Sequence, residues 1–182
     1  MKNKIAGLDF SYTSPAICIY DGSEYIFVGF RGPKKKQSSS NKNVILLEYP
    51  EKYSCTEDRF DKLTDMMFDV LIKHEITKVF LEGYSFGSMG NTFNIGEATG
   101  LMKWKLFKSG IDVEVVPPTV VKKFATDKGN AKKILMLEKF LLETDHGFKL
   151  TDLEYSVNGD KIEKPLDDLV DAYWLCKLGN SV

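Results

Sequence analysis

Hydrophobic positions in the first part of the chain form short runs separated by turn residues. Apolar runs cover residues 5–10, 16–20 and 25–30, and Ser-Pro and Asp-Gly turn signals lie between them. This pattern predicts a three-stranded antiparallel meander. A polar segment with three consecutive lysines, GPKKKQSSSNKN, follows, and a further strand is expected at residues 44–49.

The spacing of apolar positions changes to a helical period after residue 55. Phe60, Leu63, Met67, Val70 and Leu71 predict an amphipathic helix over residues 56–74. A short apolar run at 78–82, typical of a strand buried on both faces, precedes the glycine-rich GYSFGSMGN. The remaining pattern predicts a helix over about 91–108, a strand at 111–116, helices near 119–125, 130–143 and 165–177, and an irregular hairpin-like stretch before the last helix.

These elements indicate an α/β protein. A strand, a helix and a parallel strand in succession form an α/β unit, and the length suits one compact domain over residues 1–182. We therefore expect a mixed five-stranded sheet flanked by helices. Gly96, Ala98 and Gly100 would weaken an isolated helix, so their presence indicates close packing of the 91–108 helix against another helix or a partner subunit.

The composition argues against a zinc site and against a membrane-spanning protein. Cys18, Cys55 and Cys176 are odd in number and lack zinc-site spacing, so we interpret them as buried small hydrophobes in a reducing cytosol. His74 and His146 are assigned no catalytic role. No apolar run approaches the roughly 20 residues needed to span a bilayer, and we expect a soluble cytoplasmic protein without a membrane partner.

Two acids end apolar strands. Asp9 follows the first strand in Gly-Leu-Asp-Phe-Ser, and Glu82 ends the buried strand at 78–82, directly before the glycine-rich segment. An acid at a strand edge is often only a turn former. Two acids at the carboxyl ends of strands, however, are expected to meet in one crevice.

The last helix supplies further acids. Asp168 and Asp171 are three residues apart and project from one helical face. Acids in a first turn complement the helix dipole, which accounts for Asp167 and Asp168 without any function but does not account well for Asp171.

Crowded carboxylates repel one another and take up protons unless a cation neutralises them. Oxygen ligands without His or Cys suit Mg²⁺ or Mn²⁺, which also use phosphate oxygens and water. The pattern therefore predicts metal-assisted phosphate chemistry. In a two-ion site one ion activates water and the other stabilises the departing 3′ oxygen.

With these motifs in view, the sequence resembles the RuvC-type Holliday-junction resolvases of the RNase H-like superfamily, including their phage versions. The resemblance covers essentially the whole chain and is carried by GLDFS, FLEGY, the segment VKKFATDKGNAKK at residues 121–133, and the final Asp168-x-x-Asp171-Ala, which occur in the order found in the family. It implies an RNase H-like, RuvC-like fold and a metal-dependent endonuclease that cuts four-way junctions and other branched DNA.

The resemblance also implies roles for individual residues. Asp9, Glu82, Asp168 and Asp171 match the acids that bind two Mg²⁺ ions, for which Mn²⁺ can substitute. Lys122 and Lys133 match two functional lysines, and Lys133 is expected near the scissile phosphate as a catalytic residue. The register leaves two alternatives open: Asp167 in place of Asp168, and Lys132 in place of Lys133.

In the same family an aromatic residue just after the strand-end glutamate stacks on bases at the junction centre. Here Ser85 occupies that position, and Tyr84 and Phe86 flank it. Either ring is a candidate DNA contact, because stacking needs only an exposed ring, and core packing is the alternative.

Basic residues follow in a dense run. Lys122, Lys123, Lys128, Lys132 and Lys133 fall within twelve positions, and Lys103, Lys105 and Lys108 on the preceding helix are candidates to extend the stripe. A net charge of −1 gives no general attraction to nucleic acid, so the DNA interpretation depends on such clusters. A solvated face is the alternative for the run, and likewise for the lysines of residues 32–43. We expect Lys122, Lys128 and Lys132 to contact the DNA backbone.

The family resemblance further implies a twofold-symmetric homodimer, for which the small-residue face of the 91–108 helix is a candidate interface. Two other functions remain open, and a third is disfavoured. A ribonuclease acting on RNA–DNA hybrid or RNA would share the acids, and a non-catalytic protein that binds branched DNA would share the fold. An ATPase or sugar kinase related to actin needs a second domain, for which the chain has no room. The short, lysine-rich composition favours a phage origin.

Overall fold

The computed structural model describes residues 4–11, 13–31, 41–84, 92–153 and 157–182. Six strands form one mixed sheet: β1 (Ile5–Asp9), β2 (Ala16–Tyr20), β3 (Tyr25–Phe30), β4 (Val44–Leu47), β5 (Lys78–Glu82) and β6 (Asp112–Val116). Their order across the sheet is β4-β3-β2-β1-β5-β6. The predicted α/β class and the mixed sheet are confirmed, whereas the predicted count of five strands is one too few.

The sheet combines an antiparallel meander with a parallel half. β1, β2 and β3 pair antiparallel, as their turn signals predicted, and β5 and β6 pair parallel beyond β1. β4, where a strand was expected at residues 44–49, pairs parallel to β3 at the edge. A small separate hairpin joins β7 (Val157–Asn158) to β8 (Lys161–Ile162), in the stretch expected to be hairpin-like.

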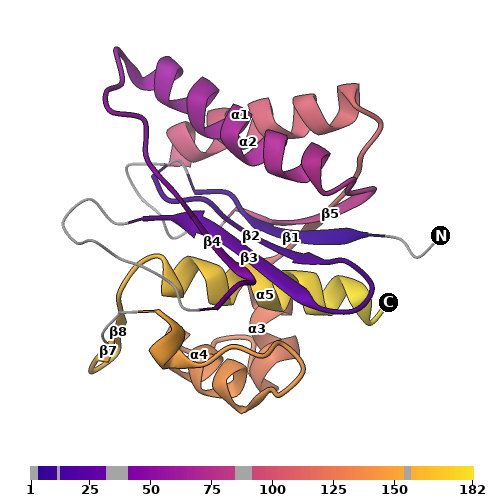
Figure 1. Cartoon of the computed structure of the whole chain (residues 1–182), viewed down its shortest axis with the longest axis vertical. Coiled ribbons are helices and arrows are strands. Elements are labelled where there is room, and N and C mark those ends of the chain that lie inside the picture. The colour runs from indigo at the N-terminus through magenta and orange to yellow at the C-terminus, as the bar shows by residue number, and fades with distance from the viewer. Residues whose placement is uncertain (1–3, 12, 32–40, 85–91, 154–156) are drawn as a thin grey trace.

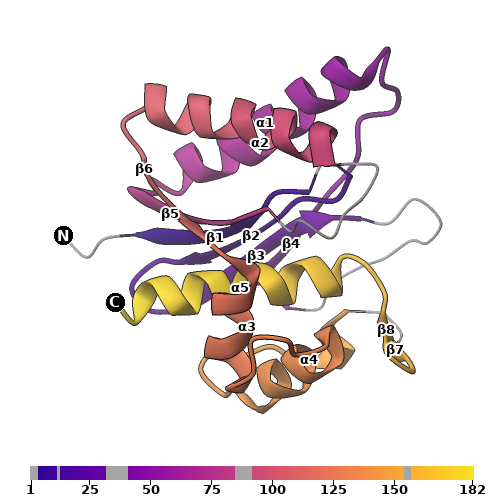
Figure 2. The same cartoon turned by 180° about the vertical axis from the view of Figure 1, so that it is seen from behind.

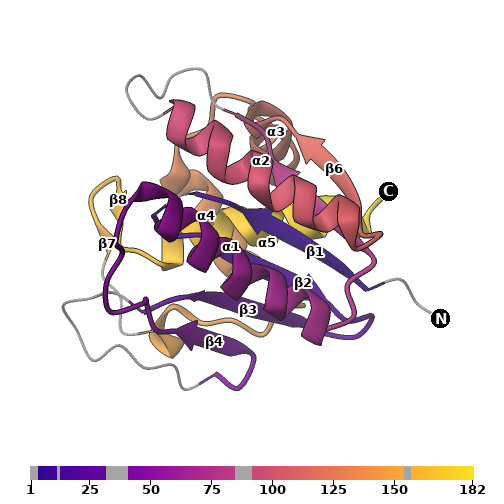
Figure 3. The same cartoon turned by 90° about the horizontal axis from the view of Figure 1, so that it is seen from above.

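Helices cover both faces of the sheet (Figure 1). On one face lie α1 (Thr56–Lys73) and α2 (Thr92–Lys108), and on the other lie α3 (Pro118–Thr126), α4 (Lys133–Leu142) and α5 (Leu166–Asn180). The view from behind shows α5 directly beneath the central strands, with α3 and α4 outside it (Figure 2). Seen from above, α1 and α2 lie side by side over the sheet (Figure 3).

Strand alternation divides β1 between two cores. Ala6 and Leu8 belong to the hydrophobic cluster under α1 and α2, while Ile5 belongs to the cluster around α5. Because successive side chains of a strand point to opposite faces, Gly7 and Asp9 lie on the α5 side with Ile5. The same alternation in β5 directs Phe80 and Glu82 to that side.

The absence of a side chain at Gly7 allows α5 to lie directly on the backbone of β1. A Cβ atom at this position would be 2.2 Å from the carbonyl oxygen of Ala172 and 2.4 Å from the backbone nitrogen of Cys176. Real atoms do not approach so closely. Near the other end of α5, a Cβ at Gly179 would meet the ring of Phe80 at 2.2 Å.

The helix expected over residues 91–108 is present, but of its three small residues only Ala98 packs within the described part of the chain. Ala98 is buried, whereas a Cβ at Gly96 or Gly100 would have no atom within 4 Å. The two glycines therefore lie on an open face of α2 and pack against no other helix of the described residues.

One further expectation is wrong. Cys18 and Cys176 are buried, but Cys55 is exposed, because it caps α1 and its Sγ accepts the backbone N–H of Asp58 at 3.4 Å. His146, to which no catalytic role was assigned, is buried and stacks on Phe140 with ring centroids 4.2 Å apart. It is a packing residue there. Among the helices of the described residues, none is long and apolar enough to cross a membrane.

Substitution of Gly7 by Ala is expected to force α5 away from β1. Overpacking of this kind costs about 1–3 kcal/mol or more. Lys139→Ala is the control, since Lys139 is exposed on α4 and a surface substitution of this kind changes stability by no more than about 0.5 kcal/mol.

Urea unfolding at one protein concentration distinguishes the two variants. The free energy of unfolding of Lys139→Ala is expected to be close to that of wild type, and that of Gly7→Ala clearly lower. A Gly7→Ala protein as stable as wild type would show that the close approach of α5 and β1 is not a constraint.

Candidate active site

A cleft of about 290 Å³ opens where β1 and β5 end. Its walls come from five separate elements and carry the four candidate acids together with Lys122 and Lys133. The lining residues are Asp9, Ser11, Glu82, Pro118, Val121, Lys122, Lys133, Met136, Lys164, Asp168 and Asp171.

Asp9 and Glu82 reach the cleft from neighbouring parallel strands. The register pairs Leu8 with Leu81, so Asp9 and Glu82 are the next positions along β1 and β5. Both side chains lie on the face covered by α5, as the alternation requires. The sheet therefore places two carboxylates side by side.

Asp168 and Asp171 face these strands from the first turns of α5. Both are buried, with Asp168 only 3% exposed. Oδ2 of Asp168 accepts a hydrogen bond of 2.7 Å from the hydroxyl of Ser14, and Oδ1 lies 3.0 Å from Nζ of Lys164. The carboxylate is thus held on both oxygens.

Lys133 links the other acids of α5. Its Nζ donates to Oδ2 of Asp171 at 2.9 Å and to Oδ2 of Asp167 at 2.7 Å. Burial lowers the pKa of Lys133, but the two carboxylates outweigh this and raise it above its ordinary value. Lys133 is therefore a permanent cation within the cleft.

Burial and mutual repulsion disfavour the charged form of the four acids. Burial, together with repulsion from Glu82, Asp168 and Asp171, raises the pKa of Asp9 well above its usual value. Burial and repulsion from Asp171 raise the pKa of Glu82 to about 7. Burial raises the pKa of Asp171 to about 6 even though Lys133 opposes the shift.

This donor set suits a hard cation. Four buried carboxylates of like charge are stabilised in their ionised form when a divalent ion lies between them. As the side chains stand, no three His, Cys, Asp or Glu residues of the described part converge closely enough to coordinate an ion. Lys133 and Lys164 instead occupy oxygens of Asp171 and Asp168.

Of the other predicted residues, Lys122 lines the cleft. Lys133 reaches the acids, whereas Lys132 is ion-paired with Asp160 at 2.6 Å. Asp167 is not on the cleft wall and pairs with Lys133. Lys128 is exposed between α3 and α4, away from the cleft lining.

The predicted aromatic contacts are only partly described. Tyr84 is 42% exposed and follows Glu82 by two residues, so it does not pack in the core. Phe86 lies outside the described residues, as do residues 32–40 of the lysine-rich segment.

The lysines of α2 do not extend the basic run. α2 follows β5 and ends before the parallel strand β6 begins, so its last turns lie at the amino ends of the strands, opposite the cleft. Lys105 is also ion-paired with Asp65 of α1. The predicted contribution of Lys103, Lys105 and Lys108 to a stripe around the acids is wrong.

Three polar residues of the site were missed by sequence reasoning. Ser11 lines the cleft, and Ser14 and Lys164 hold Asp168. The spacing of four between Lys164 and Asp168 is a detectable signal, but Ser14 is 154 positions from its partner and carries no local one.

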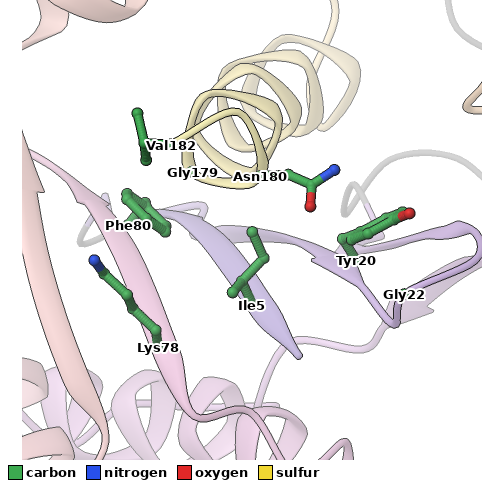
Figure 4. A pocket seen from close by; sticks show the side chains of 8 residues that line it. All are labelled: Ile5, Tyr20, Gly22, Lys78, Phe80, Gly179, Asn180 and Val182. Atoms are coloured by element: carbon green, nitrogen blue, oxygen red, sulfur yellow. The ribbon is translucent and has the colours of Figure 1, made fainter. Parts of the chain in front are cut away.

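A second cavity, of about 520 Å³, lies at the opposite end of the sheet between the start of β1 and the end of α5 (Figure 4). Its lining consists of Ile5, Tyr20, Gly22, Lys78, Phe80, Gly179, Asn180 and Val182. Lys78 is its charged side chain and is ion-paired with Glu114 at 2.8 Å. Among the described residues its lining holds no Asp or Glu, unlike that of the cleft at the other end of the sheet.

No protein-family model and no curated protein sequence matches this chain. Solved structures do match. RuvC of Thermus thermophilus is 16% identical with a TM-score of 0.59, over 97% of this chain and 96% of that one. RuvC of T. thermophilus in complex with a Holliday junction substrate is 13% identical with a TM-score of 0.58, over 98% and 95%.

A third solved structure, the yeast mitochondrial Holliday junction resolvase Ydc2, is 13% identical with a TM-score of 0.55, over 96% of this chain and 76% of that one. The chain therefore has the RuvC-like, RNase H-like fold that the sequence resemblance predicted. At identities of 13–16%, the structural similarity shows a shared fold.

The raised pKa values predict that, without divalent ions, stability falls as pH rises. The folded protein holds protons on Glu82 and Asp171 that the unfolded chain, with ordinary carboxyl pKa values, has already released. The resulting stability is present at low pH and is lost as pH rises through about 6 to 7. Glu82→Gln removes one ionising group and is expected to be more stable than wild type at about pH 8.

Thermal unfolding in chelator at about pH 5 and about pH 8 measures this difference. His146, whose pKa burial lowers, titrates in both proteins and cancels in the comparison. Glu138→Gln, at an exposed position of α4, is the control and should behave as wild type. A Glu82→Gln protein less stable than wild type at the higher pH would contradict the electrostatic account.

Proposed function

We propose that this protein with a RuvC-like fold is a metal-dependent endonuclease that cuts four-way junctions and other branched DNA. The observation that carries the proposal is the meeting of Asp9, Glu82, Asp168 and Asp171 with Lys133 in one cleft. Acids from two strands and a helix are brought together there although burial destabilises their charges. Such an arrangement is typical of a functional site, since it costs stability.

The four acids are proposed to hold two Mg²⁺ ions, with Mn²⁺ able to substitute. Oxygen-only ligands favour these hard ions over zinc or copper. When bound, the ions would supply the activation of water and the stabilisation of the departing 3′ oxygen.

The residues around the acids have separable tasks. Lys133, a permanent cation, is placed to neutralise charge that develops on the phosphate, and Lys122 adds a second cation on the same wall. Apolar Val121 and Met136 line the cleft beside them. Hydrolysis would leave 5′-phosphate and 3′-hydroxyl ends.

Contacts to DNA outside the cleft are proposed for Lys128, Lys132, Tyr84 and Phe86. Lys128 and Tyr84 are exposed, which suits backbone contact and base stacking respectively. Lys132 must exchange Asp160 for a phosphate in order to take part. That T. thermophilus RuvC was solved with a Holliday junction substrate supports branched DNA as the ligand class.

We further propose that the protein acts as a homodimer through the open face of α2. Phe93, Gly96, Gly100, Trp104 and Phe107 fall on one side of the helix, opposite the buried Ala98, Met102 and Leu106. Phe93 and Phe107 are among the most exposed large hydrophobic residues of the described part. The two glycines four positions apart would allow a second helix to approach the backbone closely.

Cleavage of a synthetic four-way DNA junction is the direct test of the activity. Wild type with Mg²⁺ or Mn²⁺ is expected to introduce paired nicks in the junction and to leave a linear duplex of the same sequence intact. Asp9→Asn and chelator should each abolish cleavage, because the ion site loses a ligand or its ion.

Lys133→Ala should reduce the cleavage rate by about two orders of magnitude, as loss of one group that stabilises developing charge does. Lys139→Ala, an exposed lysine on the same helix, is the control. Cutting of an RNA–DNA hybrid in place of the junction would move the function to a ribonuclease, and junction binding without any cleavage would contradict catalysis.

Dimer formation is tested by the molar mass in solution. Wild type is expected at twice the 20.6 kDa of one chain, and Phe107→Glu at the monomer mass, because a charge cannot be buried unpaired in an apolar interface. Leu142→Glu is a matched control, since Leu142 is 75% exposed and Phe107 77%. A monomeric wild type, or a dimeric Phe107→Glu, would contradict the proposed interface.

A further inference from the structure

Asp168 interacts with a buried neutral side chain and with a half-exposed cationic one. Ser14 contacts Oδ2 and Lys164 contacts Oδ1, at 2.7 and 3.0 Å. The Ser14 side chain is buried, whereas the side chain of Lys164 is 52% exposed. One partner is enclosed in the protein and the other reaches the acid from solvent.

Ser14 is fixed by its surroundings. Its backbone N–H donates to the hydroxyl of Ser11 at 2.9 Å, and its side chain forms a hydrogen bond with the hydroxyl of Tyr49. Tyr49 in turn stacks on the buried ring of Phe30, with centroids 4.5 Å apart. The hydroxyl of Ser14 therefore has a defined position from which it orients Asp168.

Lys164 is placed where it can move. It lines the cleft and also an adjoining cavity of about 660 Å³ that extends along the β7–β8 hairpin. The two cavities share Lys133 and Lys164. An ammonium group that leaves Asp168 has solvent-filled space beside it and needs no change in the backbone.

The carboxylate oxygen that Lys164 occupies is one that an ion would need. As the side chains stand, the acids of the described part do not converge on a common point, and lysines neutralise two of them. A divalent ion at Asp168 must compete with the ammonium group for Oδ1, whereas Oδ2 can keep its hydrogen bond from Ser14. A neutral hydroxyl group does not repel the ion, but an ammonium group does.

We propose that Lys164 is an internal counter-ion of Asp168 that a divalent ion displaces, and that Ser14 is the positioning residue that holds the carboxylate ready for the ion. The inference rests on the metal site of the proposed function. Lys164 neutralises a buried charge in the ion-free protein and thereby raises the ion concentration that the site requires.

The two residues therefore have opposite effects on ion affinity. Lys164→Met removes a competing cation and is expected to tighten Mn²⁺ binding by about two- to fivefold, the range typical of a partly exposed ion pair. Ser14→Ala releases the carboxylate and is expected to weaken binding by about tenfold, as loss of an orienting contact to a metal ligand does. Ser14→Thr retains a hydroxyl and should restore most of the affinity.

Titration with Mn²⁺ alone, followed by calorimetry or by the electron paramagnetic resonance signal of the free ion, measures the affinity without DNA and without turnover. Lys161→Met is the matched control: Lys161 lines the same adjoining cavity and forms no ion pair within the described residues. It should bind Mn²⁺ as wild type does. Lys164 is exposed, so its variant is expected to fold even if Ser14→Ala does not.

Thermal unfolding gives a second readout. In chelator, Lys164→Met should be less stable than wild type, because Asp168 has lost its counter-ion, and Mn²⁺ should raise its melting temperature by more. Unchanged or weaker Mn²⁺ binding by Lys164→Met, with normal binding by wild type, would overturn this inference alone. Absence of Mn²⁺ binding by wild type would overturn the metal site and with it the proposed function.

Discussion

The direct packing of α5 on the backbone of β1 is the contact on which the candidate site depends. It requires glycine at position 7, where a Cβ atom would lie 2.2 Å from the carbonyl oxygen of Ala172. Asp168 and Asp171 precede that contact by one turn or less on the same helix, and Asp9 follows Gly7 by two residues on the same strand. The separation between the acids is therefore set by how closely helix and strand approach.

The site that this contact creates is electrostatically unfavourable in isolation. Three of its acids are nearly fully buried, and burial is the largest cause of their raised pKa values. Lys133 and Lys164 offset part of the charge, and Ser14 supplies a hydrogen bond. A hydrophobic core of the same size would be more stable, and a site that costs stability in this way is typical of a functional site.

Local sequence patterns predicted most of the fold. The meander, the helix following residue 55 and the buried strand β5 follow from periods of two and 3.6, and the strand-end positions of Asp9 and Glu82 follow with them. The parallel pairing of β4 with β3 was not predicted, because apolar residues indicate a strand without indicating its partner. Ser14 was missed because it meets Asp168, 154 positions away, only in the folded chain, and the burial of His146 likewise depends on its contacts with Phe27 and Tyr173.

The most direct test of the central claim is the anomalous diffraction of Mn²⁺ in crystals of the wild-type protein. The account predicts two peaks between Asp9, Glu82, Asp168 and Asp171, about 3.5–4 Å apart. In crystals of Asp9→Asn prepared in the same way, each peak should be absent or much weaker. Mn²⁺ bound elsewhere on the surface with none among these four acids would contradict the claim that they form a metal-dependent active site.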